Sequence, residues 1–165
     1  TNQGVVGSDQ TGAGTARTLD AAAAYGGDKA IFGFGSGGSG ITNLVSNTGV
    51  VAADTAAVGT AKAYLAAAPY GGDKAIFAFG SEANDALINK RNLITNQGVV
   101  GSDQSGAGTA RTLDAAGTYG GDKAIFGFSG TGVTNLVNNS GVVASDTSAV
   151  GSAKGGNAAS GYGYS

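Results

Sequence analysis

The stretch Tyr25-Gly-Gly-Asp-Lys-Ala-Ile-Phe32 decides the fold of this 165-residue chain, because it recurs. The same letters stand at Tyr70–Phe77 and Tyr119–Phe126. Two glycines followed by an aspartate favour a tight turn, and the apolar residues after the lysine are typical of a buried strand. Each copy therefore predicts a β-hairpin, and its recurrence predicts a tandem repeat array.

The spacing of other residues around each copy is constant. A basic residue precedes each Tyr by 8 positions, and a Gly-Val-Val triplet precedes that basic residue by 13. Length varies only between a second Phe, such as Phe79, and an Asn, such as Asn92, which indicates a loop on a constant framework. We therefore interpret residues 1–165 as a single repeat array, with unit boundaries 1–16 (partial), 17–61, 62–110, 111–153 and 154–165 (partial).

Each unit is expected to contain four short strands separated by glycine-rich turns. In the middle unit the first two are predicted over Lys62–Ala68 and Lys74–Phe79, and in the preceding unit the last two over Asn43–Ser46 and Val50–Ala53. Repeats of 43 to 49 residues with four strands are typical of propeller blades. The predicted fold class is all-β, a β-propeller-like array of four-stranded antiparallel blades, with a β-solenoid or a fibrous trimer as the alternative.

Two resemblances rest on these letters. The order of basic residue, small-residue strand, Gly pair, aromatic strand, variable loop and Asp-bearing last strand resembles the kelch-type propeller blade. The wording Thr42-Asn-Leu-Val-Ser-Asn-Thr-Gly-Val-Val51, with the recurrent octapeptide, is similar to tandem repeats in predicted tail-fibre and other virion proteins of aquatic tailed bacteriophages.

The second resemblance implies a non-enzymatic structural or binding module of a phage virion appendage, exposed on the particle surface. Its implied partners are other copies of itself, other virion subunits, or a host-surface glycan. The alternative is a kelch-type protein–protein interaction scaffold outside a virion.

Composition points away from most catalytic and cofactor chemistry. The chain has no Cys, His, Met or Trp, and 12% of its residues are charged, with a net charge of −2. We expect no catalytic residue, no metal and no cofactor. Without a basic run or a long apolar stretch we expect neither nucleic acid binding nor membrane insertion. Because the sequence starts at Thr1 without an initiator Met, we expect a processed chain or a part of a longer one.

Three sets of repeated residues, one acidic, one basic and one of tyrosines, could bind a ligand or could hold the repeats together. The acidic set and the basic set that follows it by eight positions are Asp9, Asp54, Asp103 and Asp146, and Arg17, Lys62, Arg111 and Lys154. Either the carboxylates form a ring that binds cations or sugars, or each makes a turn and an inter-blade ion pair, which we favour. Tyr25, Tyr70, Tyr119 and Tyr162 could likewise stack on sugars, although packing between blades is favoured.

The longest variable loop, Ser81–Arg91, carries charged residues outside the repeat pattern. A variable loop on a constant scaffold is where a partner would be bound, although neutral drift of an exposed hairpin is an equal alternative. The candidate ligand-binding residues are Glu82, Asn84, Asp85, Asn89, Lys90 and Arg91.

Overall fold

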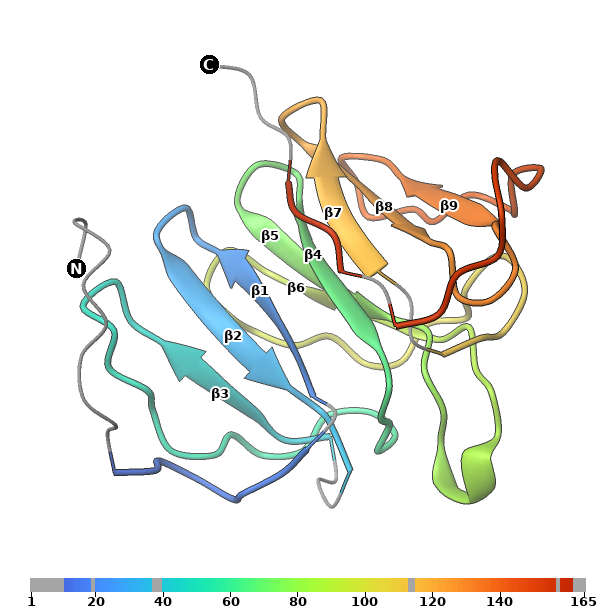
Figure 1. Ribbon diagram of the computed structural model, residues 1–165. Helices are drawn as coiled ribbons and strands as arrows, with labels where there is room; N and C mark the ends of the chain where they lie inside the picture. The colour runs from blue at the N-terminus through green and yellow to red at the C-terminus, as the bar shows by residue number, and fades with distance from the viewer. Residues whose placement is uncertain (1–10, 19, 37–39, 113–114, 157, 162–165) are drawn as a thin grey trace.

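The computed structural model describes residues 11–18, 20–36, 40–112, 115–156 and 158–161, and this part of the chain is all-β, as predicted (Figure 1). Three separate antiparallel sheets of three strands each follow one another along the chain. The strands are β1 (Ala21–Tyr25), β2 (Lys29–Gly33), β3 (Thr42–Val45), β4 (Ala66–Tyr70), β5 (Lys74–Ala78), β6 (Arg91–Ile94), β7 (Ala115–Tyr119), β8 (Lys123–Gly127) and β9 (Thr134–Val137). A short 3-10 helix, η1 (Ala83–Asp85), lies between β5 and β6.

The recurrent octapeptide forms the first hairpin of each sheet. In the second sheet Tyr70 pairs with Lys74, and the equivalent Tyr–Lys pairs close the other two hairpins. Gly71 and Gly72 have φ angles of 62° and 81°, a left-handed backbone that glycine adopts without a Cβ clash. The hairpin prediction is thus confirmed in all three units.

The prediction of a four-stranded blade is wrong, because the fourth segment of each unit forms isolated bridges with the third strand instead of a regular strand. The predicted strand Val50–Ala53 pairs with β3 only through the bridge between Val45 and Val51. Beyond this bridge two residues of β3 face three residues of the following segment. The extra residue forms a β-bulge, which disrupts regular pairing, and the segments after β6 and β9 repeat it.

Several predicted strand boundaries also change. The third strand of the first unit is Thr42–Val45 instead of Asn43–Ser46, and the first strand of the middle unit ends at Tyr70 instead of Ala68. The first strand of the middle unit starts at Ala66 instead of Lys62, because Tyr64 has a left-handed φ of 54° that interrupts the extended backbone. The next strand ends at Ala78 instead of Phe79, whose φ is 63°.

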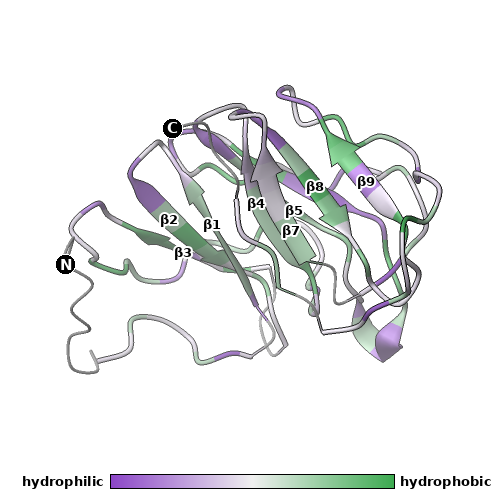
Figure 2. Cartoon of the chain, turned by 45° about the horizontal axis from the view of Figure 1, so that its top comes forward, coloured by the Kyte–Doolittle hydropathy of each residue, from purple (hydrophilic) through white to green (hydrophobic). Residues whose placement is uncertain are grey.

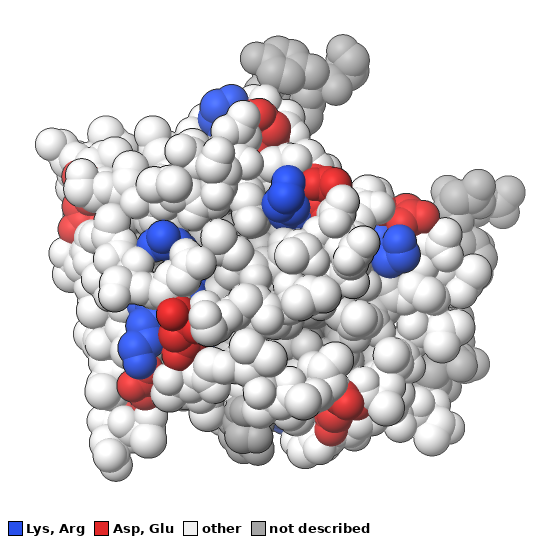
Figure 3. All heavy atoms as spheres, turned by 180° about the vertical axis from the view of Figure 1, so that it is seen from behind, with Lys and Arg blue, Asp and Glu red and all other residues white. Residues whose placement is uncertain are grey.

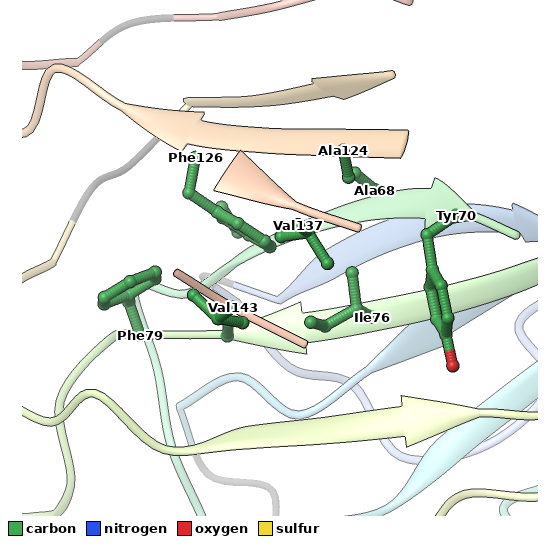
Figure 4. Packing of buried hydrophobic residues seen from close by; sticks show 10 residues of the cluster. Ala68, Tyr70, Ile76, Phe79, Ala124, Phe126, Val137 and Val143 are labelled. Carbon is green, nitrogen blue, oxygen red and sulfur yellow. The ribbon is translucent and has the colours of Figure 1, made fainter. Parts of the chain in front are cut away.

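The three sheets stack face to face, with β4 packed between β1 and β7 (Figures 1 and 2). Phe34 packs against Phe77 between the first two sheets, with ring centroids 5.4 Å apart. Phe79 and Phe126 repeat this contact at 5.5 Å between the last two sheets, where Val137, Ile76 and Tyr70 lie beside them (Figure 4). The expectation of strands covered on both faces is confirmed for β5, in which every residue from Ala75 to Ala78 is buried.

Candidate functional site

The repeated acidic and basic residues form an ion pair inside each unit. Lys62 Nζ lies 3.1 Å from Asp103 Oδ1, and both residues belong to the unit 62–110. The equivalent pairs are Arg17 with Asp54 at 4.0 Å and Arg111 with Asp146 at 3.7 Å. A repeated ion pair is therefore confirmed, but the predicted inter-blade pairing is wrong, because each pair spans its own sheet. Asp9 lies outside the described residues.

Asp103 is the best enclosed of these carboxylates. It accepts hydrogen bonds from the Thr60 amide and hydroxyl at 2.9 and 2.7 Å, from Asn92 Nδ2 at 2.9 Å and from Lys62 Nζ. Lys62 also donates to Asn92 Oδ1. With both carboxylate oxygens engaged by donors of the chain itself, this residue has a structural role, which does not favour the hypothesis of a carboxylate ring that binds cations or sugars.

The pKa values of the pair reflect this enclosure. Burial raises the pKa of Asp103, but the hydrogen bonds from Thr60, Asn92 and Lys62 outweigh burial and hold it well below its ordinary value. Burial lowers the pKa of Lys62, and the Asp103 carboxylate offsets this only in part. The two partners shift in the same direction because the Lys62 side chain is 0% exposed, whereas that of Asp103 is 19% exposed.

The same basic residues join consecutive sheets. Lys62 Nζ stands 4.7 Å from the ring centroid of Phe34 in the preceding unit, and the Lys62 carbonyl accepts a hydrogen bond from Gly35 N. Arg111 repeats both contacts with the second unit, its guanidinium lying 4.0 Å from the Phe79 ring centroid. A buried cation over an aromatic face is attracted by the ring quadrupole, so these residues fasten one sheet to the next.

The repeated tyrosines also lie between sheets. Tyr25 and Tyr70 are buried, and a Cβ added to Gly98 would stand only 3.1 Å from the Tyr25 ring. Tyr119 in the last sheet is half-buried, and Tyr162 lies outside the described residues. The packing interpretation is thus supported for the two buried tyrosines.

The variable loop is a projecting hairpin that contains η1 (Figure 1). A bridge joins Ser81 to Leu87 at its base, and Glu82 N donates to the Ala86 carbonyl. Glu82 also binds Lys90 through an ion pair of 2.5 Å, which raises the pKa of Lys90. The loop is therefore cross-linked by its own charges.

An open cleft of about 380 Å³ lies between this loop and the segment that precedes β4. Side chains from both sides line it, namely Ser36, Tyr64, Ser81, Glu82, Asn84 and Asp85. A second hollow of about 270 Å³, lined by Tyr64, Ser81, Asp85, Leu87 and Thr112, adjoins the same tyrosine. We call the two together the Tyr64 cleft; its first part has the size of a small ligand pocket.

The structure divides the six predicted loop residues into two groups. Glu82, Asn84 and Asp85 line the Tyr64 cleft. Asn89 donates to the Gly108 carbonyl at 2.8 Å, and Arg91 in β6 donates to the Ser105 carbonyl at 2.6 Å, so both fasten the following segment. Lys90 is not among the residues that line the cleft, but its ion pair positions Glu82, which is.

Three strained residues meet in the Tyr64 cleft. The left-handed non-glycine residues of the described chain include Phe34, Phe79 and Phe128, which occupy one repeated position, and Tyr64, Asn84 and Asp85, which do not. Left-handed backbone at a non-glycine residue costs free energy and clusters at functional sites. The cleft therefore carries strain that the repeat itself does not require.

Tyr64 was missed by the sequence reasoning. The sequence does mark this position, because Tyr64 departs from the repeat. It stands two residues after the repeated basic residue, where the other two units have Leu19 and Leu113. Its side chain is at the cleft surface, with the residue 37% exposed.

The rest of the described surface offers little charge for a ligand. On the face shown in Figure 3, acidic and basic groups lie side by side, and the hairpin tips pair Asp28 with Lys29, Asp73 with Lys74 and Asp122 with Lys123. Within the described ranges, no group of three or more acidic residues could hold a metal ion. No helix within the described ranges has the length and the apolar character that a membrane-spanning segment needs.

Comparisons with known proteins leave the family open. No protein-family model and no curated protein matches the chain. The chain is similar to the crystal structure of a protein of unknown function from Bacteroides caccae, at 11% identity and a TM-score of 0.43, over 80% of this chain and 46% of that one. A likeness at this level assigns neither family nor function, and the kelch and bacteriophage resemblances stay predictions.

Proposed function

We propose that this protein is a non-enzymatic binding module in which stacked, propeller-like β-sheets present the Tyr64 cleft to a glycan. The observation that carries the proposal is the cleft itself, in which an exposed aromatic ring stands beside a carboxylate and an amide on a loop outside the repeat pattern. In keeping with the tail-fibre resemblance, the module would belong to a virion appendage and the glycan to a host surface.

The chemistry of the cleft suits a neutral sugar. The Tyr64 ring offers an apolar face on which the C–H side of a sugar ring can pack. Asp85 is an acceptor and Asn84 both donor and acceptor, so together they can bind vicinal hydroxyl groups. The ion pair between Glu82 and Lys90 fixes the loop and so reduces the ordering that binding requires.

A protein partner is the second candidate, favoured by one observation. Leu87 is 54% exposed beside Tyr64 in the adjoining hollow, and an aliphatic side chain next to an aromatic one suits a protein surface better than a sugar. In that case the module would be an interaction scaffold, either between virion subunits or of kelch type outside a virion.

Glycan-array binding by the full chain and three variants tests the first proposal. We expect Tyr64→Ala and Asp85→Asn each to weaken binding by about tenfold or more, the loss expected for one good contact. Tyr64→Phe keeps the ring and should retain binding. Binding that survives both Tyr64→Ala and replacement of the loop Ser81–Arg91 by the shorter loop 129–134 would place the ligand elsewhere and overturn the proposal.

A further inference from the structure

The interface between consecutive sheets is built twice from the same contacts. In the first interface Leu44 and Tyr25 lie against the Gly-Val-Val glycine of the next unit, since a Cβ on Gly98 would stand 3.0 and 3.1 Å from them. In the second, Leu93 and Tyr70 would stand 3.0 Å from a Cβ on Gly141. We call the side with the Tyr and Leu the presenting face, and the side with the glycine the receiving face.

Hydrogen bonds between hairpin tips accompany these contacts. Gly26 N on the presenting face donates to the Asp73 carbonyl on the receiving face at 2.7 Å, and Gly71 N donates to the Asp122 carbonyl at the same distance. Each receiving face also contributes a fully buried Phe, Phe77 or Phe126, which packs on a Phe of the preceding unit.

Within the described ranges, no other sheet packs on the receiving face of the first sheet. Phe32, the equivalent of those two buried rings, is 41% exposed. A Cβ on Gly49 would meet nothing within 4 Å, in contrast to Gly98 and Gly141. Beside Phe32 lies a hollow of about 190 Å³ lined also by Arg17, whose Nε is buried without a hydrogen-bond partner.

Among the described residues, the presenting face of the third sheet is open only in part. Leu136 on β9 is 39% exposed, while Leu44 and Leu93 are packed against the next unit. Tyr119 is half-buried, whereas Tyr25 and Tyr70 are buried. The segment 158–161 runs along β7, with the Ser160 carbonyl 3.0 Å from a Cβ on Gly117, so the open part of this face centres on Leu136 and the end of β7.

We infer that these two faces bind each other between two copies of this chain, the receiving face of one copy seated on the presenting face of another. The two interfaces inside the chain show that surfaces of this composition and geometry fit together. Because the two faces differ, the contact is head-to-tail, and it generates a closed ring or an open filament instead of a symmetric dimer. The occupant of the open first sheet is thus the last sheet of a second copy.

Sedimentation of the full chain and two variants tests this inference. The wild-type protein should show concentration-dependent association, and Phe32→Ser or Leu136→Ser should each weaken it by about tenfold or more, as for loss of a buried apolar anchor. Both residues are partly exposed, so neither change opens a cavity in the core. Val50→Ser is the matched control, because its equivalents Val99 and Val142 stay 59% and 55% exposed in the internal interfaces.

Mixing the two variants distinguishes a head-to-tail contact from any other. Each variant keeps one intact face, so an equimolar mixture should form 1:1 pairs and stop there. A wild-type chain that stays monomeric up to its solubility limit would overturn the inference. So would variants that associate as the wild type does, or a mixture that fails to pair.

Discussion

At the scale of the residue, Lys62 shows how a buried charge is kept in a small, glycine-rich structure. Its ammonium group is fully buried, and it is bound by Asn92, by the Asp103 carboxylate and by the face of Phe34. The first unit holds its Arg17 more loosely, with a closest approach to Asp54 of 4.0 Å. The middle unit therefore has the shortest of the three described ion pairs, since the Arg111–Asp146 pair of the third unit measures 3.7 Å.

Asp103→Asn is expected to destabilise the fold at neutral pH by about 3–5 kcal/mol, because it leaves the buried Lys62 ammonium without a counter-charge. The free energy of unfolding, measured by urea titration at pH 7, checks this. Asp85→Asn, in the exposed part of the loop, is the control and should change the free energy of unfolding by less than about 0.5 kcal/mol.

The same carboxylate predicts a pH dependence. The pKa of Asp103 is lowered in the folded state from its ordinary value of 3.8, so its contribution to stability is complete above about pH 5. It is lost as the pH falls from there toward the folded-state pKa, because the unfolded chain takes up the proton first. Urea titrations at pH 7 and pH 3 should show a smaller acid-induced loss for Asp103→Asn than for the wild type. An equal loss in the two proteins would contradict this.

At the scale of the element, a single Gly-Val-Val glycine decides how closely two sheets approach. Gly98 and Gly49 share a φ of 81°, but only Gly98 faces the Tyr25 and Leu44 side chains of the preceding sheet. Substituting each by Ala therefore separates backbone strain from a packing clash.

Gly49→Ala should cost about 1–2 kcal/mol, the price of a left-handed backbone at a residue with a Cβ. Gly98→Ala should cost about 1–3 kcal/mol more, because its Cβ would also press on a packed interface. Thermal or urea unfolding at low protein concentration measures both. Equal losses would show that the sheets separate enough to accept the methyl group.

The sequence was most informative where the backbone is local and least informative where pairing depends on distant partners. The hairpin at Tyr70–Phe77 follows from residues adjacent in sequence, and it was predicted correctly. The bulge after β3 could not be read from Val50–Ala53, because these residues have ordinary strand propensity. The ion pairs were wrongly predicted to lie between blades, because the partner of Lys62 within its own unit, Asp103, lies 41 residues away.

The Tyr64 cleft was only half predicted. The loop Ser81–Arg91 could be identified from the sequence because its length differs between the repeats, and aligning the repeats is enough to show this. The opposite wall of the cleft could not, since Tyr64 is brought next to Asp85 by a bridge between Ala63 and Ser81, outside the hairpin strands β4 and β5. Departure from the repeat was the available signal, and it applies to both walls.

At the scale of the whole molecule, the described part of the stack has one interior sheet and two end sheets. The middle sheet is covered on both faces, whereas the first is covered on one and exposes Phe32 on the other. Figure 2 shows hydrophilic residues gathered in the hairpin turns and in η1, so the strands supply most of the apolar contact between sheets. In such arrays, stability is close to a sum of unit and nearest-neighbour terms.

Hydrogen exchange of the backbone amides should therefore differ between equivalent strands of identical local sequence. Lys29–Phe32, Lys74–Phe77 and Lys123–Phe126 are the same four residues, so their intrinsic exchange rates are closely matched and only their neighbours differ. Because its neighbours cover both faces, β5 should exchange most slowly, and β2 should open by local unfolding of the end sheet. Raising the protein concentration should slow β2 selectively if a second copy covers Phe32, and Phe32→Ser should abolish that change. Equal protection of all three strands at low concentration would instead mean that the stack unfolds as one cooperative unit, and nearest-neighbour additivity would not describe it.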